Sequence, residues 1–289
     1  MKTRFATAED LRLCESLQKK FGTTYYFASR LFPVEVRPHV ASIYGFVRVP
    51  DEWVDNPDGL SIAQRREQLS AYREELRRGY EGIRPDSAVL RAFVDTATEF
   101  DIPLQEAEVF LDAMEMDLET TRYRTYADLE GYMRGSAVAV ANMMLRVLRA
   151  PEDPRTVSAA AAMANAMQLT NFIRDIGEDY ARGRIYMPLE DLDQWGVTEQ
   201  DFDRGVVTPE IRNLLQFEIK RARELYAEAN LAIPDLPKSS QPAVRSAGEL
   251  YCEILAQVEA NDYDVFKKRA RTSKVKKLIV AGRAIIRAR

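Results

Sequence analysis

Gln168-Leu-Thr-Asn-Phe-Ile-Arg-Asp-Ile-Gly-Glu-Asp179 is the stretch that decides the fold of this chain. Its apolar residues recur at steps of three and four, which predicts an amphipathic helix. A second face of the same helix carries two amides and two carboxylates, again at steps of three and four: Gln168, Asn171, Asp175 and Asp179. Two carboxylates one turn apart repel each other, and burial raises that cost unless a cation lies between them.

The same acidic spacing occurs once more, in Asp51-Glu-Trp-Val-Asp55, and nowhere else in the chain. A lone pair of this kind is common on solvated helix faces, but apolar neighbours such as Trp53 and Val54 argue against such a face. If the two helices face each other, four carboxylates line one cavity. Like charges about 4 Å apart repel by roughly 4 kcal/mol at an effective dielectric constant of about 20. Mg²⁺ fits this arrangement because it binds a few carboxylates together with substrate phosphates. The sequence therefore predicts a divalent-metal site for a phosphate-bearing ligand.

Composition excludes several other classes of protein. Of the 289 residues, 46% are apolar and 30% are charged, which is typical of a soluble globular protein. No apolar run approaches 18 residues and the first residues contain no apolar signal core, so neither a transmembrane helix nor export is expected. Two cysteines without a Cys-x-x-Cys spacing favour a reducing, cytoplasmic location. The net charge of −4 gives no reason to expect nucleic-acid binding, and the single histidine excludes histidine-based metal sites.

The chain reads as helices joined by short linkers. The expected helices span residues 8–20, 35–54, 61–80, 87–100, 104–119, 126–150, 155–179, 210–232 and 240–263. Residues 183–188 are expected to form a loop, and residues 190–207 a polar, turn-rich segment. No alternating strand run or internal repeat occurs. Because separate domains would part the two acidic pairs, the prediction is one all-α domain over residues 1–289 with a central cavity.

Pro50 leaves two interpretations of the helix before the first acidic pair. Inside one helix, a proline kinks the axis and frees a backbone carbonyl. At the first turn of a new helix, it would fit without strain. Neither interpretation is favoured by the sequence.

Arginines accompany both acidic pairs. Arg48 lies three residues before Asp51, Arg174 adjoins Asp175, and Arg184 follows in the predicted loop. Each could be a salt-bridge partner, or each could hold diphosphate oxygens as the metal ions do.

Four stretches of the chain together resemble the squalene/phytoene synthase family, from about Thr24 to about Lys268. They are Arg30-Leu-Phe-Pro33, Tyr44-x-x-x-Arg48-x-x-Asp51-Glu-x-Val-Asp55, Met116-Asp-Leu with Arg122-Tyr-x-Thr-Tyr and Leu129-x-x-Tyr132, and Gln168-Leu-Thr-Asn-x-x-Arg174-Asp175-x-Gly-Glu-Asp179-x-x-x-Gly183-Arg-Ile-Tyr-x-Pro188. Pro50-Asp-Glu-Trp-Val-Asp-Asn-Pro57 is most similar to the bacterial branch of the family that makes phytoene.

The resemblance implies an all-helical class I isoprenoid synthase fold and a prenyltransferase that joins two prenyl diphosphates head to head through a cyclopropyl diphosphate. It implies that Mg²⁺, or Mn²⁺ in its place, is held by the four aspartates with Asn171, and that Tyr132 handles a proton or steers a cation. It places Tyr44 and Tyr251 along the reaction zone. Residues facing the diphosphates would include Thr24, Gln168, Asn171 and either Lys268 or Arg269. NADPH is not expected.

Small side chains at Ser29 and Ala41 favour two C20 substrates, geranylgeranyl diphosphate, because larger ones would shorten the tunnel. Formation of squalene or dehydrosqualene from two farnesyl diphosphates is the alternative, and a reductive squalene-type outcome would need NADPH. Two other classes stay open: a catalytically inactive scaffold and a helical nucleotide pyrophosphatase. The oligomeric state stays open as well.

The tail from about 264 to 289 is basic and contains apolar residues at Leu278, Ile279, Val280, Ile285 and Ile286. Such a segment could lie on an anionic membrane surface, which would place the protein at the inner face of the cell membrane. The alternative is a final packed helix with a solvated face.

Overall fold

A computed structural model describes residues 5–56 and 59–287. Its α-helices are α1 (Ala8–Phe21), α2 (Thr23–Ser29), α3 (Arg37–Asp55), α4 (Ile62–Tyr80), α5 (Ala88–Glu99), α6 (Leu104–Met116), α7 (Tyr126–Met133), α8 (Ala139–Leu148), α9 (Pro154–Ala181), α10 (Leu189–Trp195), α11 (Glu199–Arg204), α12 (Pro209–Asn230), α13 (Gln241–Ala260) and α14 (Lys274–Arg287). A π-helical segment, η1 (Arg134–Val138), joins α7 to α8, and a 3-10 turn, η2 (Ile233–Asp235), follows α12. The described residues form no strand, and Arg122 and Ile185 make an isolated bridge.

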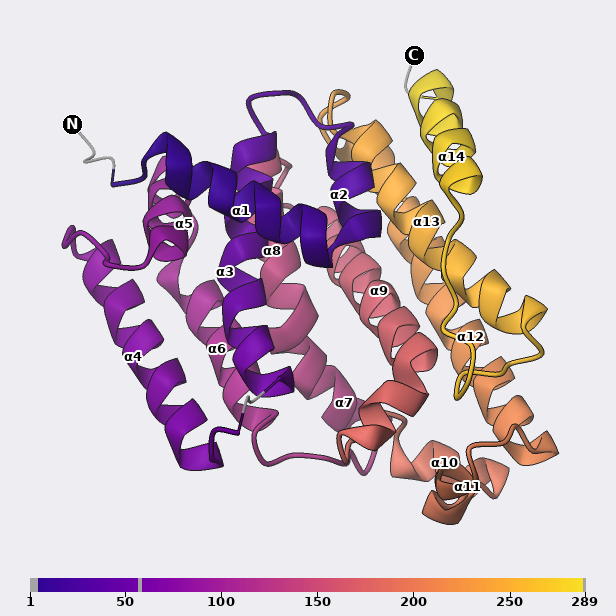
Figure 1. Ribbon diagram of the computed structural model, residues 1–289. Helices are drawn as coiled ribbons and strands as arrows, with labels where there is room; N and C mark the ends of the chain where they lie inside the picture. Colours follow the sequence, from indigo (N-terminus) through magenta and orange to yellow (C-terminus); the bar gives the residue numbers. More distant parts are fainter. Residues whose placement is uncertain (1–4, 57–58, 288–289) are drawn as a thin grey trace.

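The helices form a bundle around α3 and α9 (Figure 1). Helix α9 runs through the middle of the molecule, with α12 and α13 on one side and α8 on the other. Helix α3 packs against α1, α5, α6 and α8. The all-α architecture predicted from the sequence is confirmed, and the helices that carry the two acidic pairs are the central ones.

Local signals explain where α9 starts and stops. The side chain of Asp153 accepts hydrogen bonds from the backbone N–H groups of Arg155 and Thr156, and Pro154 occupies the first helical position. At the other end, Gly183 adopts a left-handed backbone with φ of 82°, which favours glycine. Helix α9 therefore presents both of its aspartates in the last two turns before a sharp change of chain direction.

Pro50 lies inside α3, so the interpretation of a proline within one helix is the one observed. A proline has no N–H, which leaves the carbonyl of Phe46 without its usual partner four residues later. The hydroxyl of Tyr72 on α4 donates to this carbonyl at 3.4 Å. The freed acceptor is thus satisfied by a neighbouring helix.

The small-residue segment around residue 135 lets two helices approach closely. A Cβ atom at Gly135 would lie 2.6 Å from both the Cβ of Ala113 and the carbonyl oxygen of Val109 on α6. The π-helical segment η1 occupies this point of close approach. The helix expected over 126–150 is therefore divided into α7, η1 and α8.

Two other expectations need correction. The segment 190–207 is not simply turn-rich, because it contains α10 and α11. The signals were present: Thr198 and Asp201 form a capping box at α11, and Gly196 and Gly205 end the two helices in left-handed conformations. Helix α2 lies between the helices expected over residues 8–20 and 35–54, where the sequence analysis predicted none.

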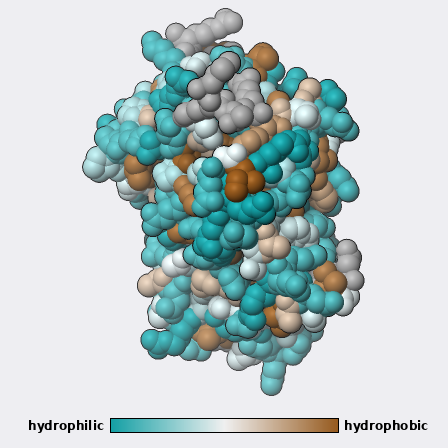
Figure 2. Space-filling model, turned by 90° about the vertical axis from the view of Figure 1, so that its left-hand side faces the viewer, coloured by the Kyte–Doolittle hydropathy of each residue, from teal (hydrophilic) through white to brown (hydrophobic). Residues whose placement is uncertain are grey.

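The side of the molecule that carries α4 is shown face-on in Figure 2, and it is largely hydrophilic with scattered apolar residues. Helix α4 matches the helix expected over residues 61–80, and its buried residues are Leu69, Tyr72, Leu76 and Gly79. In the described part of the chain, no helix is both long and apolar enough to cross a bilayer.

Candidate active site

A cavity of about 910 Å³ lies between α2, α3, α8, α9 and α13. This volume is near the upper end of the range usual for small-molecule sites. One part of its wall is acidic and carries the aspartates of α3 and α9. Much of the remaining wall is apolar or alanine-rich and includes Phe32, Ile43, Met163, Ala243 and Ala247. The cavity can therefore take a ligand with a charged head and a long apolar tail.

Asp51 and Asp55 lie one turn apart at the end of α3, and both line the cavity. Arg48 donates to the carboxylates of Asp51 and Glu52. Arg184 donates to Asp55 Oδ1 at 2.6 Å. The side chain of Asp51 is 39% exposed because it faces the cavity. Desolvation, followed by repulsion from Asp55, raises the pKa of Asp51 to about 7.

Asp175 and Asp179 lie one turn apart near the end of α9. Arg174 Nε donates to Asp175 Oδ1 at 2.8 Å, and Arg269 Nε lies 3.1 Å from the same oxygen. Burial, then the charges of Asp175 and Asp55, raise the pKa of Asp179 to about 8. Burial and the acidic neighbours of Asp179 thus both disfavour its ionised form, and a bound cation would favour it.

One guanidinium nitrogen spans the two acidic pairs. Arg182 Nη1 lies 3.9 Å from Asp55 Oδ2 and 3.8 Å from Asp179 Oδ1. The two Asp-x-x-x-Asp stretches, 120 residues apart in sequence, therefore face each other across a single side chain at one cavity.

The donor set suits a divalent cation shared with a ligand. Among residues 5–56 and 59–287, no three His, Cys, Asp or Glu side chains are grouped closely enough to hold a metal ion by themselves. Mg²⁺ needs no such all-protein cage, since it usually retains waters and takes substrate phosphates as ligands. Carboxylates that face a cavity with raised pKa values supply the hard oxygen atoms and the negative charge that such an ion requires.

Most of the other residues expected at the site line the cavity as well. They are Thr24, Tyr44, Arg48, Tyr132, Gln168, Asn171, Arg174 and Tyr251. Asn171 Nδ2 donates to Gln168 Oε1 at 3.4 Å, so these two amides form one polar patch next to the acidic pairs.

Three residues that were expected at the site lie elsewhere in the structure. Arg184 does not line this cavity: it is 7% exposed and donates to Asp55 and to the carbonyls of Val54 and Asp117, so it anchors Asp55 instead. Of the two candidate C-terminal cations, Lys268 is exposed outside the cavity wall, whereas Arg269 lines it. Ser29 lines the cavity, but Ala41 is buried in the core and does not.

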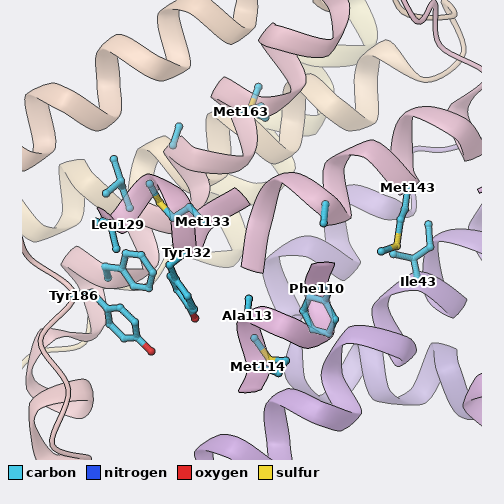
Figure 3. Close-up of a cluster of buried hydrophobic side chains, with 14 of the residues drawn as sticks. Ile43, Phe110, Ala113, Met114, Leu129, Tyr132, Met133, Met143, Met163 and Tyr186 are labelled. Atoms are coloured by element: carbon cyan, nitrogen blue, oxygen red, sulfur yellow. The ribbon is translucent and has the colours of Figure 1, made fainter. Parts of the chain in front are cut away.

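Among the residues of the cavity wall that the sequence interpretation missed are Asp117, Arg182 and Tyr186. Tyr132 donates to Asp117 Oδ2 at 2.5 Å, and Tyr186 donates to Asp117 Oδ1 at 3.2 Å. In Figure 3 the hydroxyl ends of Tyr132 and Tyr186 point the same way, out of the surrounding apolar cluster. Asp117 lies within the quoted motif Met116-Asp-Leu, so a signal for it existed.

The family model described as squalene/phytoene synthase matches residues 18–276. The chain belongs to the squalene/phytoene synthase family. It is 34% identical to a phytoene synthase from Arthrospira platensis, with 100% of this chain and 96% of that protein covered. It is 35% identical to a 15-cis-phytoene synthase from Synechococcus elongatus, with 95% and 92% covered.

A solved structure of a dehydrosqualene synthase in complex with ligand superposes on this chain with a TM-score of 0.89. The two are 28% identical, and 96% of each chain is covered. A squalene synthase from Alicyclobacillus acidocaldarius is similar over 88% of this chain, with a TM-score of 0.79 and 28% identity. Family membership and fold identify the protein as a prenyltransferase of the isoprenoid synthase fold, which confirms the family resemblance seen in the sequence.

Proposed function

We propose that this enzyme is a phytoene synthase, which condenses two molecules of geranylgeranyl diphosphate head to head and releases two diphosphates. The observation that carries the proposal is the meeting of two acidic pairs, joined by Arg182, at the wall of one large and mostly apolar cavity. Relatives that this chain resembles over nearly its whole length are named phytoene synthases.

Mg²⁺ is the ion that we propose for the acidic end, held by Asp51, Asp55, Asp175 and Asp179 with the amide oxygen of Asn171. When bound, it would neutralise the diphosphate charge and so assist departure of the leaving group. Mn²⁺ prefers the same oxygen ligands and would serve in its place.

The arginines of the cavity wall are suited to bind diphosphate oxygens. Arg48, Arg174, Arg182 and Arg269 all line the cavity, and each is paired with a carboxylate of the acidic end or its neighbours. Arginine holds phosphate oxygens in a bidentate manner, so these side chains can orient the diphosphate and stabilise its growing charge as it leaves. Their carboxylate partners would then be freed for the metal ions.

The apolar wall controls what happens to the carbocation. Departure of the first diphosphate leaves an allylic cation, which the double bond of the second substrate attacks to give a tertiary cation. Loss of a proton from this cation closes the ring of a cyclopropyl diphosphate. Tyr25 and Tyr44 stack with ring centroids 6.1 Å apart at the cavity wall, and Tyr251 lines the same wall. Aromatic faces stabilise cations, while the apolar lining keeps water away from them. The second ionisation, rearrangement and proton loss give the hydrocarbon.

Product mass tests the proposal. We expect purified enzyme with geranylgeranyl diphosphate and Mg²⁺, without NADPH, to yield a C40 hydrocarbon. Farnesyl diphosphate is the matched comparison, because a solved structure with a similar fold is a dehydrosqualene synthase, and dehydrosqualene formation is the alternative function. A C30 product formed faster than the C40 product would show that alternative to be correct. Hydrolysis of nucleoside triphosphates instead would refute both.

Peripheral membrane binding through α14 is a further part of the proposal. From Val265 to Arg289 the chain contains no acidic residue. Val280 and Ala284 pack inward, and Lys276 pairs with Glu253 of α13 at 2.8 Å, whereas four of the apolar side chains of α14 that the structure describes are exposed. They are Val275, Leu278, Ile279 and Ile286. A basic helix with exposed apolar side chains is typical of attachment to an anionic lipid surface.

Vesicle sedimentation tests whether α14 binds to membranes. We expect the wild type to bind vesicles containing phosphatidylglycerol at low salt, and the double variant Leu278→Glu, Ile286→Glu to bind at least about tenfold more weakly. Val206→Glu is the matched control, since Val206 is an exposed apolar residue outside the tail. Equal sedimentation of the double variant and the wild type would rule out this role for α14.

A further inference from the structure

Asp117 is a buried carboxylate directly behind the tyrosine of the reaction zone. It caps the end of α6 and is 7% exposed. Both of its carboxylate oxygens are occupied by phenols: Oδ2 accepts from Tyr132 of α7 at 2.5 Å, and Oδ1 accepts from Tyr186 of the loop after α9 at 3.2 Å. Three separate segments of the chain therefore meet at one carboxyl group.

The direction of these hydrogen bonds has a chemical consequence. An ionised carboxylate has no proton to donate, so both phenols must donate to it. The lone pairs of the Tyr132 oxygen then remain free to accept a proton from another partner. Asp117 and Tyr132 both line the cavity in which the carbocation forms.

The backbone of Asp117 is fixed relative to the acidic end. Arg184 donates to the carbonyl oxygen of Asp117 at 3.1 Å and, through its other terminal nitrogen, to Asp55 Oδ1 at 2.6 Å. The buried guanidinium of Arg184 thus fixes the distance between the Asp117–Tyr132 pair and the first acidic pair. Such a fixed spacing is needed if the proton leaves from a carbon close to the departing diphosphate.

We propose that Asp117 is the positioning residue of a proton relay: Tyr132 takes a proton from the carbocation and passes its own hydroxyl proton to Asp117. This inference rests on the proposed function. In the final step the C–H bond at the central carbon breaks and its electron pair forms the central C=C bond. A new O–H bond forms on Tyr132 while the old one breaks, and Asp117 ends as a neutral carboxylic acid. The carboxyl group later returns the proton to solvent by way of the same phenol.

The relay explains why a tyrosine alone would not suffice. A neutral phenol is a very weak base, because accepting a proton leaves it positively charged. Simultaneous transfer of its own proton to a carboxylate keeps the phenol neutral throughout. Tyr186 holds the second carboxylate oxygen and so keeps Oδ2 turned toward Tyr132.

Asp117→Asn is the test, with geranylgeranyl diphosphate and with the same substrate deuterated at C1. The amide keeps the shape of the carboxyl group but cannot take up the proton. We expect kcat for the C40 hydrocarbon to fall by about 100-fold while KM stays within about threefold, and the deuterium isotope effect to rise above that of the wild type. Tyr132→Phe should lose activity to a similar extent, and combining the two changes should add little.

Tyr123→Phe is the matched control. Tyr123 belongs to the same buried aromatic group, with its ring centroid 5.3 Å from that of Tyr132, but it lies outside the cavity wall. Its hydroxyl has no hydrogen-bond partner among the residues that the structure describes. We expect wild-type kinetics and an unchanged isotope effect. Near wild-type turnover in Asp117→Asn would overturn the relay, as would a loss of turnover with a raised KM and an unchanged isotope effect. Failure of the wild type to make any C40 hydrocarbon would instead refute the proposed function.

Discussion

Asp51→Asn and Asp175→Asn are each expected to lower kcat by at least about 1000-fold, because each removes an ionised oxygen ligand from the acidic end of the cavity. Asparagine preserves the size of the side chain, so helical circular dichroism should be unchanged. One variant lies on α3 and the other on α9. Equal losses would therefore reflect their convergence on one site rather than damage to one helix.

Asp112→Asn is the control for both variants. Asp112 lies on α6 with a 59% exposed side chain, and it pairs with Arg73 away from the cavity. Removing an exposed ion pair costs about 0–1 kcal/mol and should leave turnover unchanged. Turnover near the wild-type rate in either Asp51→Asn or Asp175→Asn would refute the metal role assigned to these positions.

Arg184→Ala is expected to destabilise the protein by about 3–5 kcal/mol, because it breaks a buried ion pair and leaves Asp55 with only the more distant Arg182 as a counter-charge. The carbonyls of Val54 and Asp117 lose a donor at the same time. Urea denaturation of the metal-free protein measures this change in the free energy of unfolding.

Arg204→Ala is the matched control for Arg184→Ala, since Arg204 pairs with Asp201 at 3.0 Å but its side chain is 60% exposed. We expect Arg204→Ala to change the free energy of unfolding by less than about 1 kcal/mol. Enzyme activity gives a second comparison. If Arg184 anchors Asp55 rather than the ligand, the variant Arg184→Lys should retain more activity than Arg184→Ala. Full stability of Arg184→Ala would contradict the anchoring role.

The sequence predicted the fold well because the helices carry their own signals. The steps of three and four in α9 and the acidic spacing at residues 51 and 175 are local patterns, which can be recognised without knowledge of the tertiary contacts. Pro50 could not be assigned, since a proline is tolerated inside a helix only where another group satisfies the freed carbonyl. That group is Tyr72 on a different helix.

Side-chain direction was the part that sequence could not supply. Arg182 and Arg184 are two residues apart after the same helix, yet Arg182 faces the cavity and Arg184 turns back to Asp55 and two carbonyls. Ala41 was expected at the cavity because it is small, but its position on α3 faces the core. The pairing of Asp117 with Tyr132 depends on how α6 packs against α7, which no local motif encodes.

Divalent-metal binding is the most direct test of the central claim that the two acidic pairs act as one site. Mn²⁺ would be titrated by electron paramagnetic resonance into wild-type protein, Asp51→Asn and Asp175→Asn, each with an unreactive thio analogue of the prenyl diphosphate. We predict that the wild type binds the ions together with the analogue. Either variant should weaken binding of both ligands by at least about tenfold, since diphosphate and metal are held jointly. Wild-type metal affinity in both variants would contradict the account.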